Sequence, residues 1–473
     1  MAFTRKACRA TMILGLTVMG GSLRAQAVMP FSRYAAQVEA NHPIAQQARL
    51  VAAQARTAMQ EAWGAFDPKL SLSFAQKAYK GEQYFSYLDA GVKVPTPIGA
   101  DLKLGFERAS GFRVSDDRTT PRSGLFSLGL SVPVGQRLIT DERRTAFTIA
   151  RAQREIGDAE RQGMINKLLL DAAKAYGAWY AAERRFEIAA EGVTLATFRL
   201  QAVEQRVRNG ENAPIDTLEA SLEVQRRAVA RLEAENERLA ARVMAAVFLW
   251  DSRGQPEELP PDAQPVLAGL DQTTTDTTRL AIWIAAVASR HPELRKVEGK
   301  LRAAQAERLF AQQAQIPFAE ATVAAIGDRD PIGLLGASDR WRDNFKAGLD
   351  VESSLLLLKE RGKAARSRQK EEFVRLDRDL LRRELAYDVR LALNDVVLLE
   401  RVLTAQRANV RSASQLRDAE QTRFSSGEST LLVVNLRERL VLDESAKLAT
   451  VEGKLAAARA ALVVAVGDAS LIR

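Results

Sequence analysis

The chain contains one structural unit twice. Each half opens on a histidine–proline pair and places a second proline at the same distance from it. Each half then passes a glycine–leucine pair and ends on a glycine turn. Because an internal repeat defines the structural unit, we predict a helix, strands, a long helix, a tight turn and a second long helix in each half. The shared landmarks are His42-Pro43, Pro68, Gly129-Leu130 and Gly210 in the first half, and His291-Pro292, Pro317, Gly348-Leu349 and Gly427 in the second.

Long stretches carry apolar residues at alternating spacings of three and four. This period of 3.5 is typical of helices that supercoil around one another. The first stretch, residues 165–207, would form roughly 63 Å of helix at 1.5 Å per residue. Similar stretches occupy residues 215–250, 385–413 and 441–465. Since the stretches flank the two glycine turns, they predict two long antiparallel helical hairpins.

Six shorter runs show partial alternation of apolar and polar residues, which is typical of strands. In the first run, Leu70, Leu72 and Phe74 alternate with Ser71 and Ser73. Each run is close to the ~9 to 11 residues with which a tilted strand crosses a bilayer. A small soluble sheet capping the helices is the alternative. The runs are residues 69–79, 85–94, 101–108, 125–134, 317–326 and 344–353, and the aromatic residues suited to a lipid interface are Tyr79, Tyr84, Phe85, Tyr87 and Trp341.

A membrane sheet of this size cannot stand alone. Unpaired backbone groups at a sheet edge cost several kcal/mol each in hydrocarbon, and the smallest membrane barrels need eight strands. Four to six strands per chain would therefore close a barrel only if several copies contribute. The first half is longer than the second between its second proline and its glycine–leucine pair, and the excess covers residues 85–108. An extra strand pair and an external hairpin both remain open for this excess.

The first residues have the form of a secretory signal. Arg5, Lys6 and Arg9 precede an apolar stretch at residues 11–21, and Ala25-Gln26-Ala27 resembles a cleavage site. Cys8, the only cysteine, lies inside this segment, so we expect no thiol for a disulfide, a metal or a lipid anchor in the exported protein. No later run reaches the ~20 apolar residues of a membrane-spanning helix.

The remaining composition argues against nucleic-acid binding and catalysis. The formal net charge is +9, but the basic residues alternate with acidic ones along the predicted helices. Such a pattern favours solvated helix faces over a nucleic-acid surface. His42 and His291 occupy equivalent repeat positions before prolines, which favours a structural role. We therefore predict no enzyme, no metal site and no cofactor.

The order of these features resembles the TolC-like outer-membrane efflux protein family, from about Pro30 to Ala465. His291-Pro292-Glu293-Leu294 looks like the Asn/His-Pro-Glu-Leu starts of that family, and Ile316-Pro317 looks like its strand-opening Leu-Pro. The resemblance implies a fold that is mainly α with β. Its long antiparallel coiled-coil helical hairpins form two tandem repeats, and its transmembrane β-strands form a shared trimeric β-barrel.

The resemblance also implies a division of the chain. Residues 1–27 would be the signal peptide and residues 28–255 the first structural repeat. Residues 256–280 would be a linker at the belt around the middle of the tunnel. Residues 281–467 would be the second structural repeat, and residues 468–473 a C-terminal tail.

The function implied by the resemblance is that of an exit duct in a tripartite efflux or type I secretion system. A homotrimer in the outer membrane of a Gram-negative bacterium, with its helices in the periplasm, would passively conduct substrate. The partners would be a periplasmic adaptor protein, an inner-membrane pump of the RND or ABC type, and outer-membrane lipid. Two rival interpretations are a periplasmic coiled-coil adaptor and a structural protein without a membrane barrel.

In that family the two turns are periplasmic tips that dock on the adaptor or the pump. Gly210 and Gly427 allow the left-handed backbone that ends a helix, Asn212 or Ser429 could cap the next helix, and Pro214 suits its first turn. The docking residues implied by the resemblance are Asn209, Gly210, Glu211, Ser426, Gly427 and Glu428, which differ from the Val-Gly-Leu of many members.

The expected periplasmic gate departs from the family in a second way. Many members carry aspartates six and nine residues after the second tip glycine, where this chain has Val433 and Leu436. If the register carries over, the entrance is closed by an apolar constriction with Asn435 nearby, and it lacks an acidic ring for divalent ions.

Overall fold

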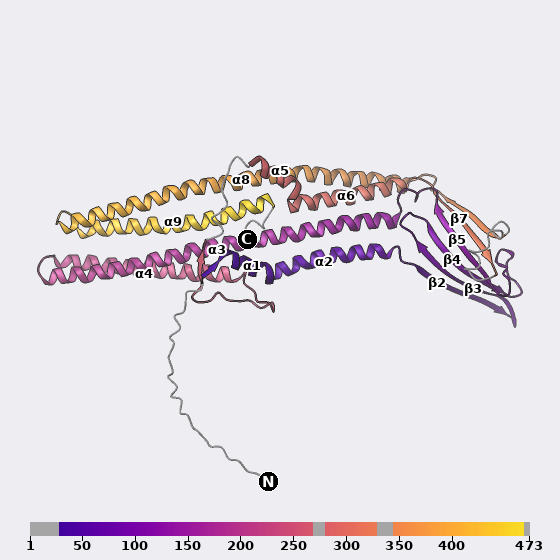
Figure 1. The fold of residues 1–473 in the computed structure, drawn as a ribbon, viewed down its shortest axis with the longest axis horizontal. Helices are drawn as coiled ribbons and strands as arrows, with labels where there is room; N and C mark the ends of the chain where they lie inside the picture. Colours follow the sequence, from indigo (N-terminus) through magenta and orange to yellow (C-terminus); the bar gives the residue numbers. More distant parts are fainter. Residues whose placement is uncertain (1–27, 268–279, 329–343, 468–473) are drawn as a thin grey trace, which may run out of the picture.

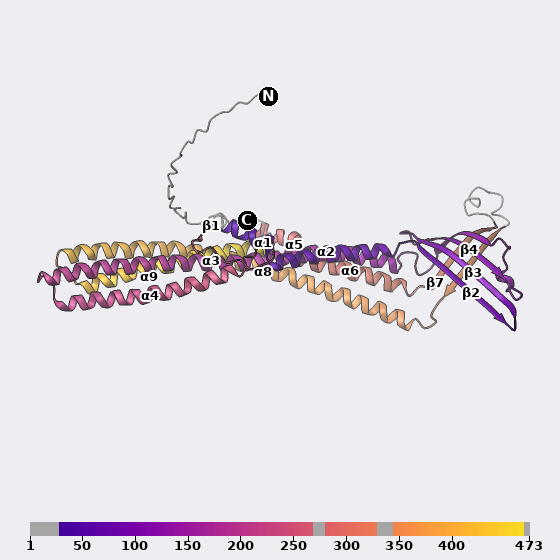
Figure 2. The ribbon, with the colours of Figure 1, turned by 90° about the horizontal axis from the view of Figure 1, so that it is seen from below.

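The computed structural model describes residues 28–267, 280–328 and 344–467. The predicted signal peptide, part of the predicted linker, Trp341 and the predicted C-terminal tail lie outside the described residues. The molecule is long and narrow, with one sheet at one end and two helical turns at the other (Figures 1 and 2). Two long helices connect these ends.

Helices make up most of the length. The two longest have 67 and 68 residues, which at 1.5 Å per residue is about 100 Å each. Each leads into a glycine turn and is followed by a helix that runs back beside it, so the two predicted antiparallel hairpins are confirmed. The helices are α1 Phe31–Asn41, α2 Pro43–Gly64, α3 Glu142–Arg208, α4 Pro214–Ala246, α5 Leu280–Arg290, α6 Pro292–Gln313, α8 Leu358–Ser425 and α9 Leu431–Val466, with a single 3-10 turn η1 at Asp116–Arg118.

The sheet has six strands in the order β2-β3-β4-β5-β7-β8, and each strand pairs antiparallel with its neighbours. All six predicted strand runs are confirmed to within a few residues. The excess of the first half forms β3 and β4, which pair inside the sheet of the single chain. The strands are β2 Lys69–Tyr79, β3 Glu82–Pro95, β4 Asp101–Ser110, β5 Leu125–Pro133, β7 Phe318–Gly327 and β8 Phe345–Glu352.

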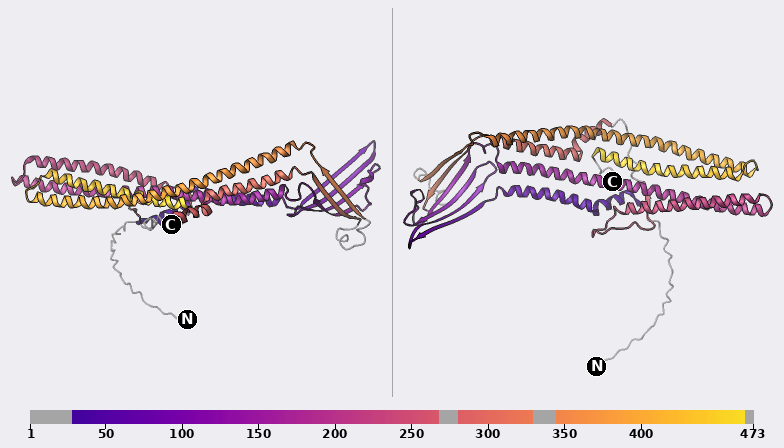
Figure 3. Two further views of the ribbon diagram at one scale, coloured as in Figure 1. Left: turned by 90° about the horizontal axis from the view of Figure 1, so that it is seen from above. Right: turned by 180° about the vertical axis from the view of Figure 1, so that it is seen from behind.

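The helices stand side by side as a wall with two edges. Towards the glycine turns, α3 packs against α4 and α9, and α9 packs against α8; towards the sheet, α3 lies between α2 and α6, and α6 packs against α8. One edge of the wall therefore consists of α4, α2 and β2, and the other of α8 and β8 (Figures 1 and 3). α8 spans the length that α4 and α2 share at the first edge, and β8 corresponds to β2.

The largest buried core lies near the middle of the wall. Tyr34, Tyr176 and Trp179 are fully buried there. The Tyr176 hydroxyl donates to the carbonyl oxygen of Met29 at 2.6 Å and accepts from the amide nitrogen of Val266 at 2.8 Å. These two bonds fix α3 to the short parallel pair of β1 Val28–Pro30 and β6 Gln264–Val266, which anchors the segment before α1 and the segment after α4 to one helix.

The predicted apolar seams of α3 and α4 differ in whether the single chain buries them. On α3 the seam is buried, for example at Leu168, Ala172 and Trp179. On α4, which ends four residues before the predicted seam does, the apolar seam residues face solvent in the single chain. We call these exposed residues the α4 stripe: Ile215, Leu218, Leu222, Val229, Leu232, Leu239 and Val243.

The opposite edge carries a similar feature. Besides the apolar residues of α8 that are buried within the chain, a second set at helical spacing is exposed along the outer side of this helix. We call it the α8 stripe: Phe373, Leu376, Leu380, Tyr387, Leu391 and Leu398. Both edges of the wall therefore present apolar side chains that the single chain does not cover.

The two histidines cap equivalent helices, so their predicted structural role is confirmed. His42 Nδ1 accepts from the amide of Ile44 at 3.1 Å at the start of α2, and His291 Nδ1 accepts from the amide of Glu293 at 3.3 Å at the start of α6. An unprotonated nitrogen is needed to accept. Burial lowers the pKa of both imidazoles, which keeps them in the neutral form that caps the helix.

These caps predict a stability that depends on pH. The unfolded chain binds protons at histidine near pH 6.5, whereas the folded caps resist protonation, so their contribution is complete above that pH and is lost as the pH falls below it. We expect the thermal midpoint to fall more steeply between pH 7 and pH 5 for the native chain than for the double variant His42→Asn, His291→Asn, since asparagine caps without titrating. Replacing either histidine by alanine should instead cost about 1 kcal/mol at pH 7.5. Equal pH slopes for the native chain and the asparagine variant would contradict the assignment.

Candidate docking tips and gate segment

The two glycine turns have the same geometry. Gly210 has φ +74° and Gly427 has φ +77°, the left-handed backbone that glycine adopts without strain. The amide of Glu211 donates to the Arg206 carbonyl at 2.9 Å, and the equivalent amide of Glu428 donates to the Arg423 carbonyl at 2.9 Å. This six-to-one bond is the Schellman ending of a helix. The predicted left-handed glycines are confirmed, and they give two blunt tips of equal shape.

All six predicted docking residues are exposed. They lie at the end of the molecule opposite the sheet, around the α3–α4 and α8–α9 turns (Figure 1). A Cβ added at Gly210 or Gly427 would meet no atom within 4 Å. These glycines are therefore needed for the backbone conformation of the turn, and the space above them is open for a partner.

The predicted side-chain caps of the helices after the turns are wrong. The residue before α4 is Ala213 and the residue before α9 is Thr430, and neither makes a side-chain cap. Asn212 instead donates from Nδ2 to Asp216 at 2.8 Å, and Ser429 donates to Glu420. Each helix begins one residue later than a cap at Asn212 or Ser429 requires. Pro214 does occupy the first turn of α4, as predicted.

A small apolar cluster joins the two tips. Val203, Ala220 and Leu431 are buried against one another, so α3, α4 and α9 meet just above the turns. The guanidinium of Arg206 lies 5.7 Å from the ring centre of Phe424, which links α3 to α8. The tips therefore behave as one end of the molecule and not as two free hairpins.

The predicted gate residues occupy three different environments on the first turns of α9. Val433 is half-buried and Leu436 is 55% exposed. Asn435 is buried inside the chain, where its Oδ1 accepts from Arg199 Nη1 at 3.1 Å. Only the first two have side chains with access to the surface of the single chain, while Asn435 belongs to a polar cluster between helices.

That polar cluster, which the sequence did not reveal, is built from buried charges. Arg227 of α4 is 5% exposed and Glu438 of α9 is 3% exposed. Arg227 donates to Glu223 at 2.9 Å from Nε and to Glu438 at 2.9 Å from Nη2. Arg199 also pairs with Glu438. We call the whole set the charged cluster: Arg199, Glu223, Arg227, Asn435, Glu438 and Arg439.

The charged cluster ties the two helical hairpins together. Arg199 lies on α3, Glu223 and Arg227 lie on α4, and Glu438 lies on α9, so each carboxylate bridges different helices. Because buried ion pairs are poor substitutes for apolar packing but costly to break, such a cluster specifies one alignment of the helices. The expectation that the charges of these helices are solvated is wrong here, since a glutamate and an arginine four residues apart look the same in sequence whether buried or exposed.

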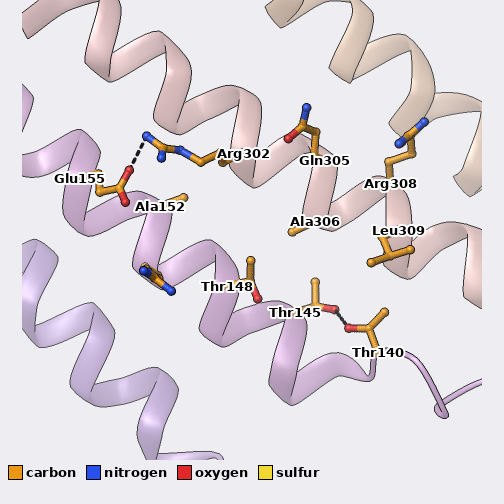
Figure 4. Close-up of a pocket in the computed structure, with 11 residues that line it drawn as sticks. Thr140, Thr145, Thr148, Ala152, Glu155, Arg302, Gln305, Ala306, Arg308 and Leu309 are labelled. Atoms are coloured by element: carbon orange, nitrogen blue, oxygen red, sulfur yellow. Dashed lines mark hydrogen bonds and ion pairs between the residues drawn. The ribbon is translucent and has the colours of Figure 1, made fainter. Parts of the chain in front are cut away.

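A second polar region lies at the other end of the helices, between α3 and α6. It is an open groove of about 610 Å³ in which Glu155 pairs with Arg302 at 2.5 Å and the Thr140 and Thr145 hydroxyls lie 3.0 Å apart (Figure 4). Arg308, also at the groove, pairs with Glu371 of α8 at 2.7 Å. Arg302 therefore joins the two halves of the chain near the sheet, while Arg308 joins α6 to α8 within the second half.

Within residues 28–267, 280–328 and 344–467, histidine, cysteine, aspartate and glutamate side chains form no group of three that could hold a metal ion. Among the helices of the described chain, none combines the length and the apolar character required to cross a membrane.

Comparison with known proteins places the fold among outer-membrane channels. Residues 283–468 match the family model described as outer membrane efflux protein. No curated relative matches the chain. The predicted resemblance to the outer-membrane efflux proteins is thereby confirmed, by sequence for the second half and by fold for nearly the whole chain.

Solved structures of outer-membrane channels have a similar fold over most of the chain. The open state of the MtrE outer membrane channel of Neisseria gonorrhoeae has a TM-score of 0.63 at 15% identity, covering 93% of this chain and 89% of that one. The outer-membrane channel OprN has a TM-score of 0.61 at 17% identity, covering 92% and 89%. The CmeC outer membrane channel of Campylobacter jejuni has a TM-score of 0.60 at 11% identity, covering 93% and 86%. Each of these three neighbours is described as an outer-membrane channel.

Proposed function

We propose that this protein is the outer-membrane exit duct of a tripartite efflux or type I secretion system, working as a homotrimer. The observation that carries the proposal is the wall with two matching edges, each of which combines an exposed apolar helix stripe with a strand whose outer side has no partner strand in the sheet of the single chain. A contact between different edges of successive copies is heterologous and closes into a ring when the rotation allows it. The number of copies in the ring, three, is taken from the resemblance to the outer-membrane efflux proteins.

The faces of the sheet support a site in lipid. Residues that pair directly across strands share a face, and one such row is apolar on all six strands. The neighbouring row, on the other face, is mainly polar or small. The apolar row is Leu70, Val92, Leu104, Leu128, Ala325 and Phe345, and the other row is Lys69, Lys93, Lys103, Gly129, Ala324 and Lys346.

This two-faced sheet matches a barrel wall with lipid outside and water inside. Its strands have 8 to 14 residues, which agrees with the ~9 to 11 residues needed to cross the hydrocarbon. The edge strands β2 and β8 must find partners there, because unpaired backbone groups are not tolerated in lipid. In a ring of copies, one neighbour supplies a β8 partner for β2 and the other neighbour supplies a β2 partner for β8.

The tips and the gate complete the proposal. The two repeats would be tandem coiled-coil units in the periplasm, with residues 256–280 at the belt and residues 1–27 removed as a signal. The exposed turns at Gly210 and Gly427 would dock on a periplasmic adaptor and an inner-membrane pump of the RND or ABC type. Val433 and Leu436 would form the apolar constriction. Asn435, which is buried inside the chain, would hold this part of α9 against α3 through its hydrogen bond with Arg199.

The experiment that tests this function is fractionation followed by native mass measurement. We expect the full chain to sediment with the outer membrane, to need detergent for extraction and to have three times the mass of one processed chain. A stable monomer in the periplasmic fraction would overturn the proposal and favour a structural protein or an adaptor.

A channel measurement then tests the gate. In planar bilayers, we expect micromolar multivalent cations to leave the conductance unchanged, because the two positions that many family members fill with aspartate hold Val433 and Leu436. The double variant Val433→Asp, Leu436→Asp should gain a block by the same ions. A strong block of the native channel would contradict the apolar gate.

A further inference from the structure

Within the described residues, the strand pair β3–β4 has no counterpart in the second half of the chain. The part of the second half that the structure describes, with residues 329–343 outside it, has two strands, β7 and β8, between α6 and α8, whereas the first half has four between α2 and α3. Both extra strands are fully paired, since β3 is bonded to β2 on one side and to β4 on the other, and β4 to β5. The insertion therefore widens the sheet and does not stand apart from it.

The inserted strands continue both faces of the sheet without interruption. Val92 and Leu104 join the apolar row between Leu70 and Leu128, while Gly91 and Gly105 face each other on the polar side. In an external hairpin surrounded by water, the apolar and polar faces would not have to match those of the neighbouring strands β2 and β5. In this register, β3 and β4 present the same apolar face and the same polar face as β5 and β7.

Ion pairs on the polar face show that the sheet curls towards that face. Lys103 of β4 reaches Glu320 of β7 at 3.6 Å, across β5. Lys346 of β8 reaches Glu107 of β4 at 3.7 Å, across β5 and β7. On a flat sheet, strands three places apart are separated by roughly 14 Å. The inserted strand β4 therefore takes part in the curvature that makes the polar face concave.

We propose that β3 and β4 are wall strands of the shared barrel, so that each copy supplies six strands and three copies close an 18-stranded barrel through a β2–β8 seam. This inference rests on the proposed trimeric duct. A barrel of 16 to 18 strands leaves an aqueous channel. The outer end is therefore a wide, water-filled opening, and the size limit for cargo lies elsewhere along the duct.

The direction of the edge strands fits the seam. β2 follows α2 and runs away from the helices, and β8 precedes α8 and runs back towards them. The two edges of neighbouring copies are therefore antiparallel, like every other pair in the sheet. Across the seam, Leu70 and Leu72 of β2 must lie on the same face of the sheet as Phe345 and Leu349 of β8. A slip of one residue in the pairing would move all side chains of one strand to the opposite face. Only registers that differ by an even number of residues are therefore allowed.

The wall position of β4 is tested by single cysteines in a Cys8→Ser background. In outer-membrane vesicles, we expect a charged, impermeant thiol reagent to modify Lys103→Cys but not Leu104→Cys, and a lipid-soluble maleimide to modify Leu104→Cys. On β7, which is a wall strand with or without the insertion, Thr322→Cys and Val323→Cys serve as the matched controls for the polar and the apolar face.

The outcomes separate this inference from the proposed function. Modification of both Lys103→Cys and Leu104→Cys by the charged reagent, with Val323→Cys protected, would place β4 outside the wall and overturn the inference alone. Modification of Val323→Cys by the charged reagent would show that the sheet is not in lipid, and would overturn the duct as well.

The seam is tested by disulfides that only neighbouring copies can form, since β2 and β8 lie at opposite edges of one sheet. We pair Ser71→Cys or Ser73→Cys with Gly348→Cys or Asp350→Cys, all on the polar face. At least one pair should give crosslinked dimers and trimers, and no larger species, on denaturing gels. The control pair Ser73→Cys with Leu349→Cys, on opposite faces, should stay monomeric. Crosslinking of the control alone, or species beyond three copies, would overturn the 18-stranded seam.

Discussion

Replacing Leu232 by glutamate is expected to leave the single chain folded and to prevent assembly. Leu232 lies in the middle of the α4 stripe and is 62% exposed in the chain by itself. A surface substitution of this kind usually changes the free energy of unfolding by less than about 0.5 kcal/mol. If the stripe packs against the α8 edge of the next copy, the variant loses about 1.5 to 3 kcal/mol of apolar burial at every interface and also buries a charge.

Because about 1.4 kcal/mol is a factor of ten in affinity, we expect the association between copies to weaken by about 100-fold or more. Native mass measurement in detergent should show monomers, while circular dichroism should show unchanged helix content. Arg231→Gln is the matched control, since it changes the charge by the same amount one residue away at another exposed position of α4. A trimer that survives Leu232→Glu would show that the α4 stripe is not an interface.

The two helical hairpins and the strands of the sheet were predictable because their apolar spacing persists over many residues. The strand runs were placed to within a few residues because they alternate in part, as Leu70 to Phe74 do, and because five of the six end at or just before a glycine, a proline or a charged residue. The two tips were predictable for a local reason, since Gly210 and Gly427 each follow a long helix and each allow the left-handed backbone.

Periodicity alone does not say which surface a stripe covers. The apolar stripes of α3 and α4 have the same spacing, yet the first is buried within the chain and the second is exposed. Inside the α3–α4 hairpin, the buried side of α4 is made of Ala220, Ala234 and the charged pair Glu223 and Arg227. Small residues allow close helix approach, and the sequence cannot show that distant Glu438 completes the pair.

The excess of the first half shows the same limit. Alternation identified residues 85–108 as strand-like, but a hairpin outside a barrel alternates as well. The pairing of β3 with β2 and of β4 with β5 places these residues inside the sheet of the single chain, and this pairing depends on contacts between strands, not on the pattern within one strand. Long-range pairing of this kind is the part of a β-structure that local patterns do not contain.

Replacing Glu438 by glutamine is expected to loosen the end of the molecule that carries the tips. The carboxylate of Glu438 accepts from Arg227 and pairs with Arg199, and all three lie between α3, α4 and α9. Glutamine has almost the same shape but no charge, so the variant leaves two arginines without their shared anion. Breaking a buried ion pair from one side costs about 3 to 5 kcal/mol, which is a large share of a typical free energy of unfolding.

The loss should be local, because the core around Tyr176 and the sheet share no residue with the charged cluster. We expect amide exchange to rise near Arg199, Arg227 and Glu438 and to stay unchanged around Tyr176, with a larger single-channel conductance as α9 separates from α3 and α4. Glu187→Gln is the control, because its partner Arg184 is exposed on α3 and such surface pairs contribute about 0.5 kcal/mol or less. Equal exchange in the two variants would mean that the charged cluster does not hold the hairpins together, and the alignment of the tips would then depend on the small apolar cluster of Val203, Ala220 and Leu431 alone.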